Sequence, residues 1–124
     1  MAYADVLLNE VRAAHIIVIG LPVYNFGVPS QLKSWIDQLA RKGETFQYTE
    51  KGPEGLLKGK KAIIAMASDG TKRGSAIDFA SGYVKHMMNF FGITDVEIVA
   101  ADAIAYAPET TVPAALQEVD ALAL

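Results

Sequence analysis

Apolar runs alternate with segments of helical periodicity along the chain. Residues 15–22, HIIVIGLP, form a continuous β-branched run without polar alternation, which predicts a strand buried on both faces. Residues 60–68, KKAIIAMAS, and 94–104, TDVEIVAADAI, predict two further strands. Strands that alternate with helices in this way are typical of a parallel sheet whose two faces are both covered by helices.

Four segments around these strands carry apolar residues at helical spacing. They predict helices over residues 4–13, from residue 30 to near residue 43, over 75–91 and over 109–122. The apolar stripe of the second helix consists of Leu32, Trp35, Ile36 and Leu39. One side of the third helix carries Ile77, Ala80, Val84, Met87, Met88 and Phe91.

The ends of these helices carry recognisable signals. Ser30 fits an N-cap residue for the second helix, and Pro29 fits the first helical residue as an alternative. Gly43 and Gly92 fit as stop signals for the second and third helices.

Two segments show neither a strand-like apolar run nor helical spacing of apolar residues. Residues 44–59 contain a short extended piece at 46–49 and turn signals, which indicates a long loop or a small hairpin. Residues 69–75, DGTKRGS, form a glycine-containing loop. Because there is no internal repeat and no low-complexity linker, we expect residues 1–124 to form a single domain.

Composition narrows the possible functions. The 124 residues carry a formal net charge of −3 without a basic block, so nucleic acid is not an expected partner. The absence of cysteine excludes disulfides and thiolate chemistry. The sequence starts without a signal-peptide pattern, and no apolar run reaches the roughly 18–20 residues of a membrane span. We therefore expect a soluble, cytoplasmic domain with no membrane partner.

Candidate chemistry gathers in two loops that leave strands at their carboxyl ends, residues 22–29 and 68–74. Ligands of open α/β sheets bind at these ends, and the two loops lie side by side if their strands are neighbours. Tyr24 and Phe26 offer flat surfaces and Asn25 offers an amide, which suits a planar ligand with a heteroatom edge. In the structural alternative, the aromatics close the top of the sheet and Asn25 is a turn residue. The second loop adds Ser68, Asp69, Gly70 and Gly74.

Several familiar motifs are missing. The sequence contains no G-x-G-x-x-G, no P-loop and no G-x-S-x-G nucleophile elbow. Its two histidines, His15 and His86, lie far apart in the chain and lack H-x-x-x-H spacing. A metal site is therefore not expected.

The sequence resembles one enzyme family over nearly its whole length. Residues 22–37 follow the pattern P-x-Y-N-F-x-x-P-x-x-L-K-x-x-x-D, which resembles the FMN-dependent NADH azoreductase branch of the flavodoxin-like NAD(P)H quinone reductases. TFQYTEKGPEGLLKGKKA, residues 45–62, is similar to the same branch. FGITDVEIVAADAIAYAPE, residues 91–109, resembles its last strand and the segment that follows. In all, the likeness runs from about residue 4 to residue 109 or beyond.

The resemblance implies a flavodoxin-like three-layer α/β sandwich and a homodimer that binds FMN. It also implies the reaction of an NADH:quinone oxidoreductase or azoreductase. Hydride passes from NADH to the flavin N5 in a ping-pong cycle, and then to a quinone or an azo compound. The flavin carries this chemistry, so no catalytic side chain is expected.

The resemblance further assigns positions around the flavin. The residues that border the ring are Pro22, Val23, Tyr24, Asn25, Phe26, Ala67, Ser68, Asp69 and Gly70. Tyr48 matches an aromatic over the open face of the ring, near the partner subunit, and Phe26 also lies near the substrate. Gly27 and Pro29 shape the turn between strand and helix.

Two departures from the family pattern modify this picture. The second loop reads Ala67-Ser68-Asp69-Gly70 where Ser-Arg-Gly-Gly is typical, so an acid replaces a small residue. If Asp69 points at the ring, it disfavours the reduced anion, and the flavin potential of Asp69→Gly would show this. The family's first two strands, with the loop that binds the FMN phosphate, have no counterpart here. We therefore expect an N-terminally truncated domain of about three strands, whose first strand has an unpaired apolar edge.

Three functional hypotheses follow. The first is FMN-dependent NADH:quinone oxidoreductase or azoreductase activity. The second is a non-catalytic truncated remnant, a structural module that self-associates through residues 15–20. The third is a nucleotide-binding regulator that retains flavin without redox turnover.

Overall fold

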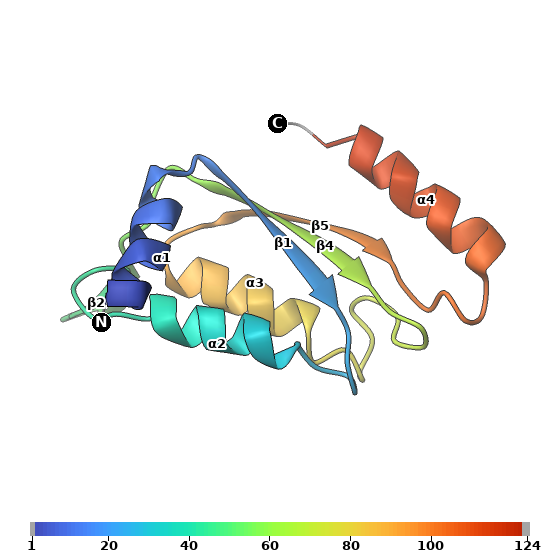
Figure 1. The fold of residues 1–124 in the computed structure, drawn as a ribbon, viewed down its shortest axis with the longest axis horizontal. Coiled ribbons are helices and arrows are strands. Elements are labelled where there is room, and N and C mark those ends of the chain that lie inside the picture. The colour runs from blue at the N-terminus through green and yellow to red at the C-terminus, as the bar shows by residue number, and fades with distance from the viewer. Residues whose placement is uncertain (1, 123–124) are drawn as a thin grey trace.

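A computed structural model describes residues 2–122, with a three-stranded parallel sheet at the centre (Figure 1). The strands are β1 (Ile16–Pro22), β4 (Lys61–Ala67) and β5 (Asp95–Ala101), in the order β1-β4-β5. β4 is central and pairs in parallel with both neighbours. The three predicted strands and their parallel arrangement are thus confirmed.

Four helices and a hairpin complete the described chain. The helices are α1 (Ala2–Ala13), α2 (Ser30–Leu39), α3 (Ser81–Phe90) and α4 (Pro108–Asp120). The small hairpin predicted as one alternative for residues 44–59 is present as β2 (Phe46–Thr49) and β3 (Gly52–Gly55). α2 and α3 cover one face of the sheet, and α4 lies beyond the opposite face (Figure 1). None of these helices is long and apolar enough to cross a membrane.

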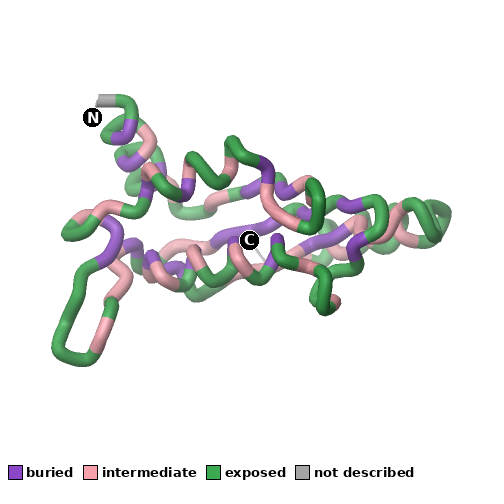
Figure 2. Tube along the Cα trace, turned by 90° about the horizontal axis from the view of Figure 1, so that it is seen from below, coloured by how far each residue is buried: buried purple, intermediate pink, exposed green. Residues whose placement is uncertain are grey.

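The hydrophobic core lies between the sheet and the pair α2 and α3. In Figure 2 buried residues recur along the body of the molecule, whereas the hairpin is largely exposed. The most deeply buried side chains of this core are Leu21, Ile36, Leu39, Ile64, Val84, Met88, Phe91 and Ile93.

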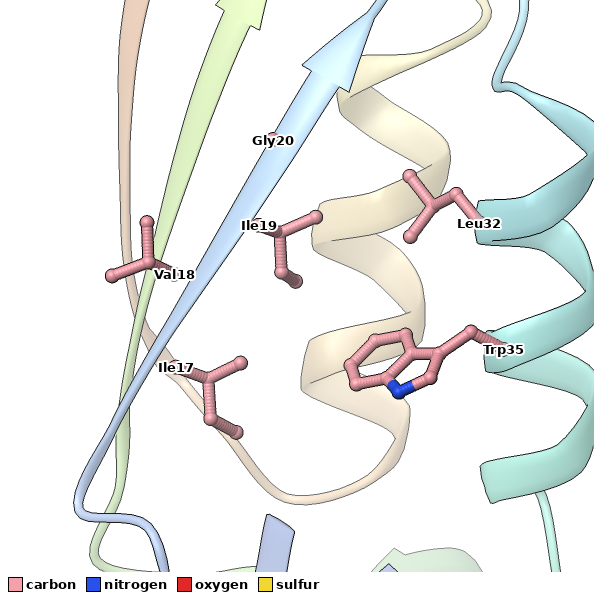
Figure 3. Close-up of a pocket in the computed structure, with 6 residues that line it drawn as sticks. All are labelled: Ile17, Val18, Ile19, Gly20, Leu32 and Trp35. Atoms are coloured by element: carbon pink, nitrogen blue, oxygen red, sulfur yellow. The ribbon is translucent and has the colours of Figure 1, made fainter. Parts of the chain in front are cut away.

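β1 is buried on one face only. Ile17 and Ile19 point toward Leu32 and Trp35 of α2, while Val18 points to the other side (Figure 3). The Val18 residue is 67% exposed. The prediction that this strand is buried on both faces is therefore wrong. Within residues 2–122, α4 packs along β5 and no helix covers this face at β1.

The second helix differs from its prediction at both ends. Pro29 is the N-cap residue, with φ −61° and ψ 149°, and makes no side-chain cap. Ser30 is consequently the first helical residue, so it is not the N-cap, and Pro29 is not the first helical residue. The helix ends at Leu39, before the predicted stop at Gly43, because the buried Thr45 hydroxyl donates to the Leu39 carbonyl at 2.6 Å. A side chain six residues away thus satisfies an open carbonyl of the last turn.

The third helix begins six residues later than predicted. The Asp78 carboxylate accepts the backbone N–H groups of Ala80 and Ser81, both at 2.9 Å, and that of Gly74 at 2.9 Å. These bonds hold the preceding residues in turns and start the helix at Ser81. The predicted stop is correct, since Gly92 has a φ of 101° after the last turn.

Candidate functional site

The two loops singled out in the sequence lie side by side. Because β1 and β4 are parallel neighbours, both loops leave the sheet at its carboxyl edge. The N–H of Val23 donates to the carbonyl of Ala67 at 2.9 Å and joins the first loop to the end of β4, where the second loop begins. The predicted proximity of residues 22–29 and 68–74 is confirmed.

The first loop contains a tight turn from Tyr24 to Gly27. The two residues exchange backbone hydrogen bonds of 3.1 and 2.9 Å. Both central residues are left-handed, Asn25 with φ 49° and Phe26 with φ 68°, as a type I′ turn requires. A bulky residue in this region costs about 1–2 kcal/mol, and such strain persists where surrounding contacts fix it. Here the carbonyl of Phe26 accepts the N–H of Phe79 at 3.0 Å.

Several polar groups of the two loops make no hydrogen bond to the described residues. Among residues 2–122, the Asn25 side-chain amide makes no hydrogen bond, so the turn does not depend on it. Within the same residues, the backbone N–H groups of Asn25, Phe26, Asp69 and Gly70 reach no protein acceptor. These groups suit a planar ligand whose edge carries hydrogen-bond acceptors.

The second loop is rigidly fixed to the segment after β5. The buried Ser68 hydroxyl donates to the carbonyl of Thr71 and accepts the N–H of Ala103 at 2.9 Å. The N–H of Ile104 donates to the Ser68 carbonyl at 3.0 Å, and that of Ala105 donates to the Asp69 carbonyl at 2.9 Å. Ser68 is therefore a positioning residue that locks this loop against residues 101–106.

Two cavities open beside these loops and share Val23, Ser68 and Asp69. The larger one, about 430 Å³, is lined by Val23, Asn25, Phe26, Ser68, Asp69, Gly70, Thr71, Ile77 and Tyr106. The smaller one, about 220 Å³, is lined by Pro22, Val23, Tyr24, Ala67, Ser68, Asp69 and Ile104. The larger volume lies in the range of about 300–1,000 Å³ that is usual for ligand sites.

The nine residues that the resemblance places around a flavin ring all line one cavity or the other. The structure thus gathers them at one place, and their role toward a ligand stays a prediction. Asp69 lines both cavities and is the single charged residue among the described lining residues.

Tyr48 does not join the other site residues within one chain. It lies on β2, at the end of the sheet away from the carboxyl-end loops (Figure 1). Its side chain is 62% exposed and contacts the Phe46 ring edge to face, with 5.6 Å between the ring centres. The Lys42 ammonium lies 5.6 Å from the centre of the Tyr48 ring. A role near the ligand would therefore require the hairpin of a second subunit.

Tyr106 is a site residue that the sequence reasoning missed. It lines the larger cavity and is 80% exposed. Its ring borders Gly70, where an added Cβ would lie 3.8 Å from the Tyr106 Cε2. Its place after the third strand, at the same sheet edge as the other two loops, was a usable signal. Thr71, Ile77 and Ile104 were missed as well.

A metal centre has no support in this geometry. Within residues 2–122, no three His, Asp or Glu side chains gather closely enough to hold an ion. His15 and His86 are both exposed.

Residues 1–123 match the family described as having the Flavodoxin-like fold. The chain belongs to this family. The flavodoxin-like α/β fold expected from the sequence is thereby confirmed, and the parallel order β1-β4-β5 agrees with it.

Curated relatives and solved structures extend this finding. The chain is 55% identical over 123 residues to FMN-dependent NADH:quinone oxidoreductase 1 from Jannaschia sp. (strain CCS1), covering 99% of this chain and 64% of that protein. It is 54% identical over 120 residues to the FMN-dependent NADH:quinone oxidoreductase of Cereibacter sphaeroides (strain ATCC 17029 / ATH 2.4.9). This match covers 97% of this chain and 61% of that protein. The structure is similar to that of an FMN-dependent NADH-azoreductase from Bacillus anthracis str. Ames Ancestor in complex with FMN, with a TM-score of 0.88 and 35% sequence identity. The match covers 96% of this chain and 59% of that chain.

These comparisons confirm the resemblance read from the sequence motifs. The chain spans less than two thirds of the length of these relatives.

Proposed function

We propose that this flavodoxin-like chain acts in FMN-dependent reduction of quinones or azo compounds by NADH. The observation that carries the proposal is the pair of cavities between residues 22–26 and 67–70, which brings all nine expected ring-bordering residues together. Support also comes from relatives named FMN-dependent NADH:quinone oxidoreductase at 53–55% identity.

The residues of the cavities fit the ring of FMN. When bound, FMN accepts a hydride from NADH and returns two electrons and a proton to a quinone, whose second proton comes from solvent. The Asn25 amide and the open backbone N–H groups would hold the heteroatom edge, while Tyr24 and Phe26 would flank the flat faces. Ser68 would keep the second loop in place through its bonds to Thr71 and Ala103.

The same proposal covers assembly and location. We place the chain in the cytoplasm, where NADH is available, and expect a homodimer. Support for the dimer is the exposed Tyr48, which lies away from the cavities of its own chain. A partner hairpin is the part of the molecule that could bring this ring to the site.

Anaerobic spectroscopy tests the proposal directly. Purified chain is mixed with FMN, freed of unbound flavin, and then given NADH followed by a neutral benzoquinone. We expect retained flavin absorbance, bleaching by NADH and recovery on quinone addition. Asn25→Ala should weaken flavin retention, and Glu50→Gln, an exposed change on the hairpin, should not.

Other spectral outcomes point to other functions. A chain that retains no flavin and oxidises no NADH contradicts the proposal. Retained flavin without bleaching by NADH favours the nucleotide-binding regulator.

A second candidate function, self-association, is favoured by the open edge of β1. Within the part of the chain that the structure describes, β1 pairs only with β4, and Val18 is exposed beside a groove of about 220 Å³. This groove is lined by Ile17, Val18, Ile19, Gly20, Leu32 and Trp35. Unpaired apolar edges pair readily with another strand, so a second copy of β1 is the expected occupant.

The opposite edge of the sheet is closed by side chains. The N–H of Ala100 on β5 donates to the Glu118 carboxylate at 3.2 Å. Arg73 donates to the Ile98 carbonyl at 2.8 Å and to the Glu118 carboxylate at 2.9 Å. Self-association is therefore expected at β1 and not at β5.

Sedimentation analysis of Val18→Lys tests this candidate, because an edge lysine opposes strand pairing. We expect dissociation of any assembly built on β1, with Val112→Lys on α4 as the matched control. An oligomeric state that Val18→Lys leaves unchanged would contradict pairing through this strand.

A further inference from the structure

The second loop is held at both of its ends by two consecutive residues that follow β5. At one end, the Ser68 hydroxyl accepts the N–H of Ala103 at 2.9 Å. At the other end, the Asp102 carboxylate accepts the backbone N–H of Arg73 at 2.6 Å. Residues 69–72 therefore lie between two fixed points whose partners are adjacent in the sequence.

The turn that carries these two partners is strained. Ala103 has a positive φ of 53°, a conformation that costs a residue with a side chain about 1–2 kcal/mol. Strain of this kind persists where surrounding contacts fix it. Here Ala103 itself bonds to Ser68, and the residue before it bonds to Arg73. The conformation of residues 102–103 is thus coupled to that of the loop.

The Asp102 carboxylate serves the loop alone. It is half-buried, and within residues 2–122 it forms no ion pair and no other hydrogen bond. The guanidinium of Arg73 is engaged elsewhere, by the Ile98 carbonyl at 2.8 Å and the Glu118 carboxylate at 2.9 Å. Because a carboxylate is a stronger acceptor of a peptide N–H than a neutral oxygen, the bond from Arg73 is a strong constraint on the loop backbone.

The constrained segment carries two of the open hydrogen-bond donors of the site. The backbone N–H groups of Asp69 and Gly70 reach no acceptor within residues 2–122, and both residues line the larger cavity. Donors that are fixed before a ligand arrives bind it with little ordering cost. A displacement of such groups by about 1 Å can lower a rate about 100-fold.

We propose that Asp102 is a positioning residue, which holds the N–H groups of Asp69 and Gly70 in place for the edge of a bound flavin ring. Asp102 lines neither of the two cavities and acts through the backbone of Arg73. The inference rests on the proposed function and deepens it. Peptide N–H donors at the heteroatom edge stabilise the electron-rich reduced ring more than the oxidised ring. A loosened loop therefore lowers the reduction potential of bound flavin.

The first measurement uses the chain without flavin. NMR relaxation gives the backbone order parameter of the Gly70 amide, which is about 0.85 for rigid backbone and below about 0.6 for flexible backbone. We expect a rigid Gly70 in the wild type and a decrease to about 0.6 or below in Asp102→Ala. Asp102→Asn keeps an acceptor oxygen for the Arg73 N–H and should restore most of the order.

The second measurement is the reduction potential of FMN bound at saturation, determined against redox dyes. Asp102→Ala should bind FMN about three- to tenfold more weakly and shift the potential to more negative values. Asp102→Asn should stay close to the wild type in both quantities. A loss of global stability alone does not move the potential of a saturated folded chain, so this readout separates positioning from folding.

Glu118→Ala is the matched control. It removes a carboxylate that lines the same cavity of about 380 Å³ as Asp102, and it breaks the ion pair of Arg73. It leaves the hydrogen bond from the Arg73 backbone in place. We expect the Gly70 order parameter and the flavin potential of this variant to match the wild type, whatever stability it loses in urea unfolding.

The outcomes distinguish this inference from the proposed function. A Gly70 amide as ordered in Asp102→Ala as in the wild type would overturn the inference. So would a flavin potential that Asp102→Ala leaves unchanged, or that Glu118→Ala shifts equally. These results in a wild type that retains FMN and reduces quinone overturn the inference alone. A Gly70 amide that loosens in Asp102→Ala, in a chain whose wild type retains no flavin and oxidises no NADH, overturns the proposed function and supports the role of Asp102 in holding the loop.

Discussion

At the scale of single residues, strain and side-chain hydrogen bonds concentrate beside the two loops. Asn25 and Phe26 are adjacent left-handed residues, a conformation that two bulky or branched side chains rarely share. Backbone strain of this kind is characteristic of ligand sites, where the surrounding structure maintains it. The turn therefore holds Phe26 at a backbone cost that surrounding contacts, such as the hydrogen bond from Phe79, must offset.

A pair of substitutions at Phe26 separates backbone strain from ring contact. Phe26→Gly removes the ring and relieves the positive φ, whereas Phe26→Ala removes the ring and keeps the strain. We expect the glycine variant to be more stable by about 1 kcal/mol in urea unfolding, and both variants to lose flavin binding to a similar extent. Equal stability of the two variants would show that the turn is not strained at this residue.

The cap of α3 predicts a dependence of stability on pH. Burial raises the pKa of Asp78, but hydrogen bonds from Ser81, Gly74 and Ala80 outweigh it and lower this pKa below its usual 3.8. Because the folded pKa is depressed, the unfolded chain takes up the proton first as the pH falls. The stabilisation is therefore present above about pH 4 and is lost as the pH falls through the folded pKa.

Asp78→Asn removes the charge and one acceptor oxygen of this cap. We expect it to lower the free energy of unfolding by about 1–2 kcal/mol at pH 7, with a smaller difference from wild type at pH 3. Lys85→Gln, an exposed change on the same helix, serves as the control. A difference that is the same at pH 7 and pH 3 would contradict the ionised cap.

At the scale of elements, the hairpin is fixed by one close backbone contact. The N–H of Leu57 donates to the carbonyl of Phe91 at 2.8 Å, directly after β3. A Cβ on Gly55 would lie 2.0 Å from the backbone nitrogen of Gly92. The end of β3 and the end of α3 can approach this closely only because both positions are glycines.

Gly55→Ala should therefore displace the hairpin. We expect a loss of about 1–3 kcal/mol of stability, since the clash is with backbone and not with a flexible side chain. Gly82→Ala, in α3 with open space around the added methyl, should instead stabilise by about 0.5–1 kcal/mol. Thermal unfolding compares the two, and a Gly55→Ala variant as stable as wild type would contradict the contact.

The elements also show how far the sequence pattern predicts the fold. The apolar runs predict β1, β4 and β5 correctly, because a strand inside the sheet needs consecutive apolar residues, which can be recognised from the local sequence alone. The sequence pattern does not predict the end of α2 or the start of α3, since Thr45 and Asp78 reach their hydrogen-bond partners only in the folded chain. The motif of residues 22–26 located one wall of the candidate site.

Other features of the site depend on tertiary proximity. Tyr106 was missed because its neighbour Gly70 lies on a different loop, far away in the sequence. The exposure of Val18 was missed for a different reason. A continuous apolar run indicates that both faces of a strand favour burial. It does not indicate which face a helix covers, and in this structure none covers the face that carries Val18 within residues 2–122.

At the scale of the whole molecule, the two cavities beside the carboxyl-end loops carry very little charge. Every lining residue of the two cavities is neutral except Asp69. A phosphate group is usually held by lysine, arginine or a helix N-terminus. The two cavities therefore combine planar surface and hydrogen-bond donors with no lining cation, so they suit the ring of the proposed flavin better than its phosphate.

Riboflavin and FMN share the ring and differ in the phosphate, so the ratio of their affinities measures how much the phosphate contributes to binding. We expect dissociation constants that agree within about threefold, because the ring supplies the contacts and the dianionic phosphate gains no ion pair. Quenching of flavin fluorescence measures both constants under the same conditions, and Asp69→Asn should strengthen FMN more than riboflavin because it removes repulsion of the dianion. An FMN affinity more than tenfold above that of riboflavin would show that a phosphate site exists outside the two cavities.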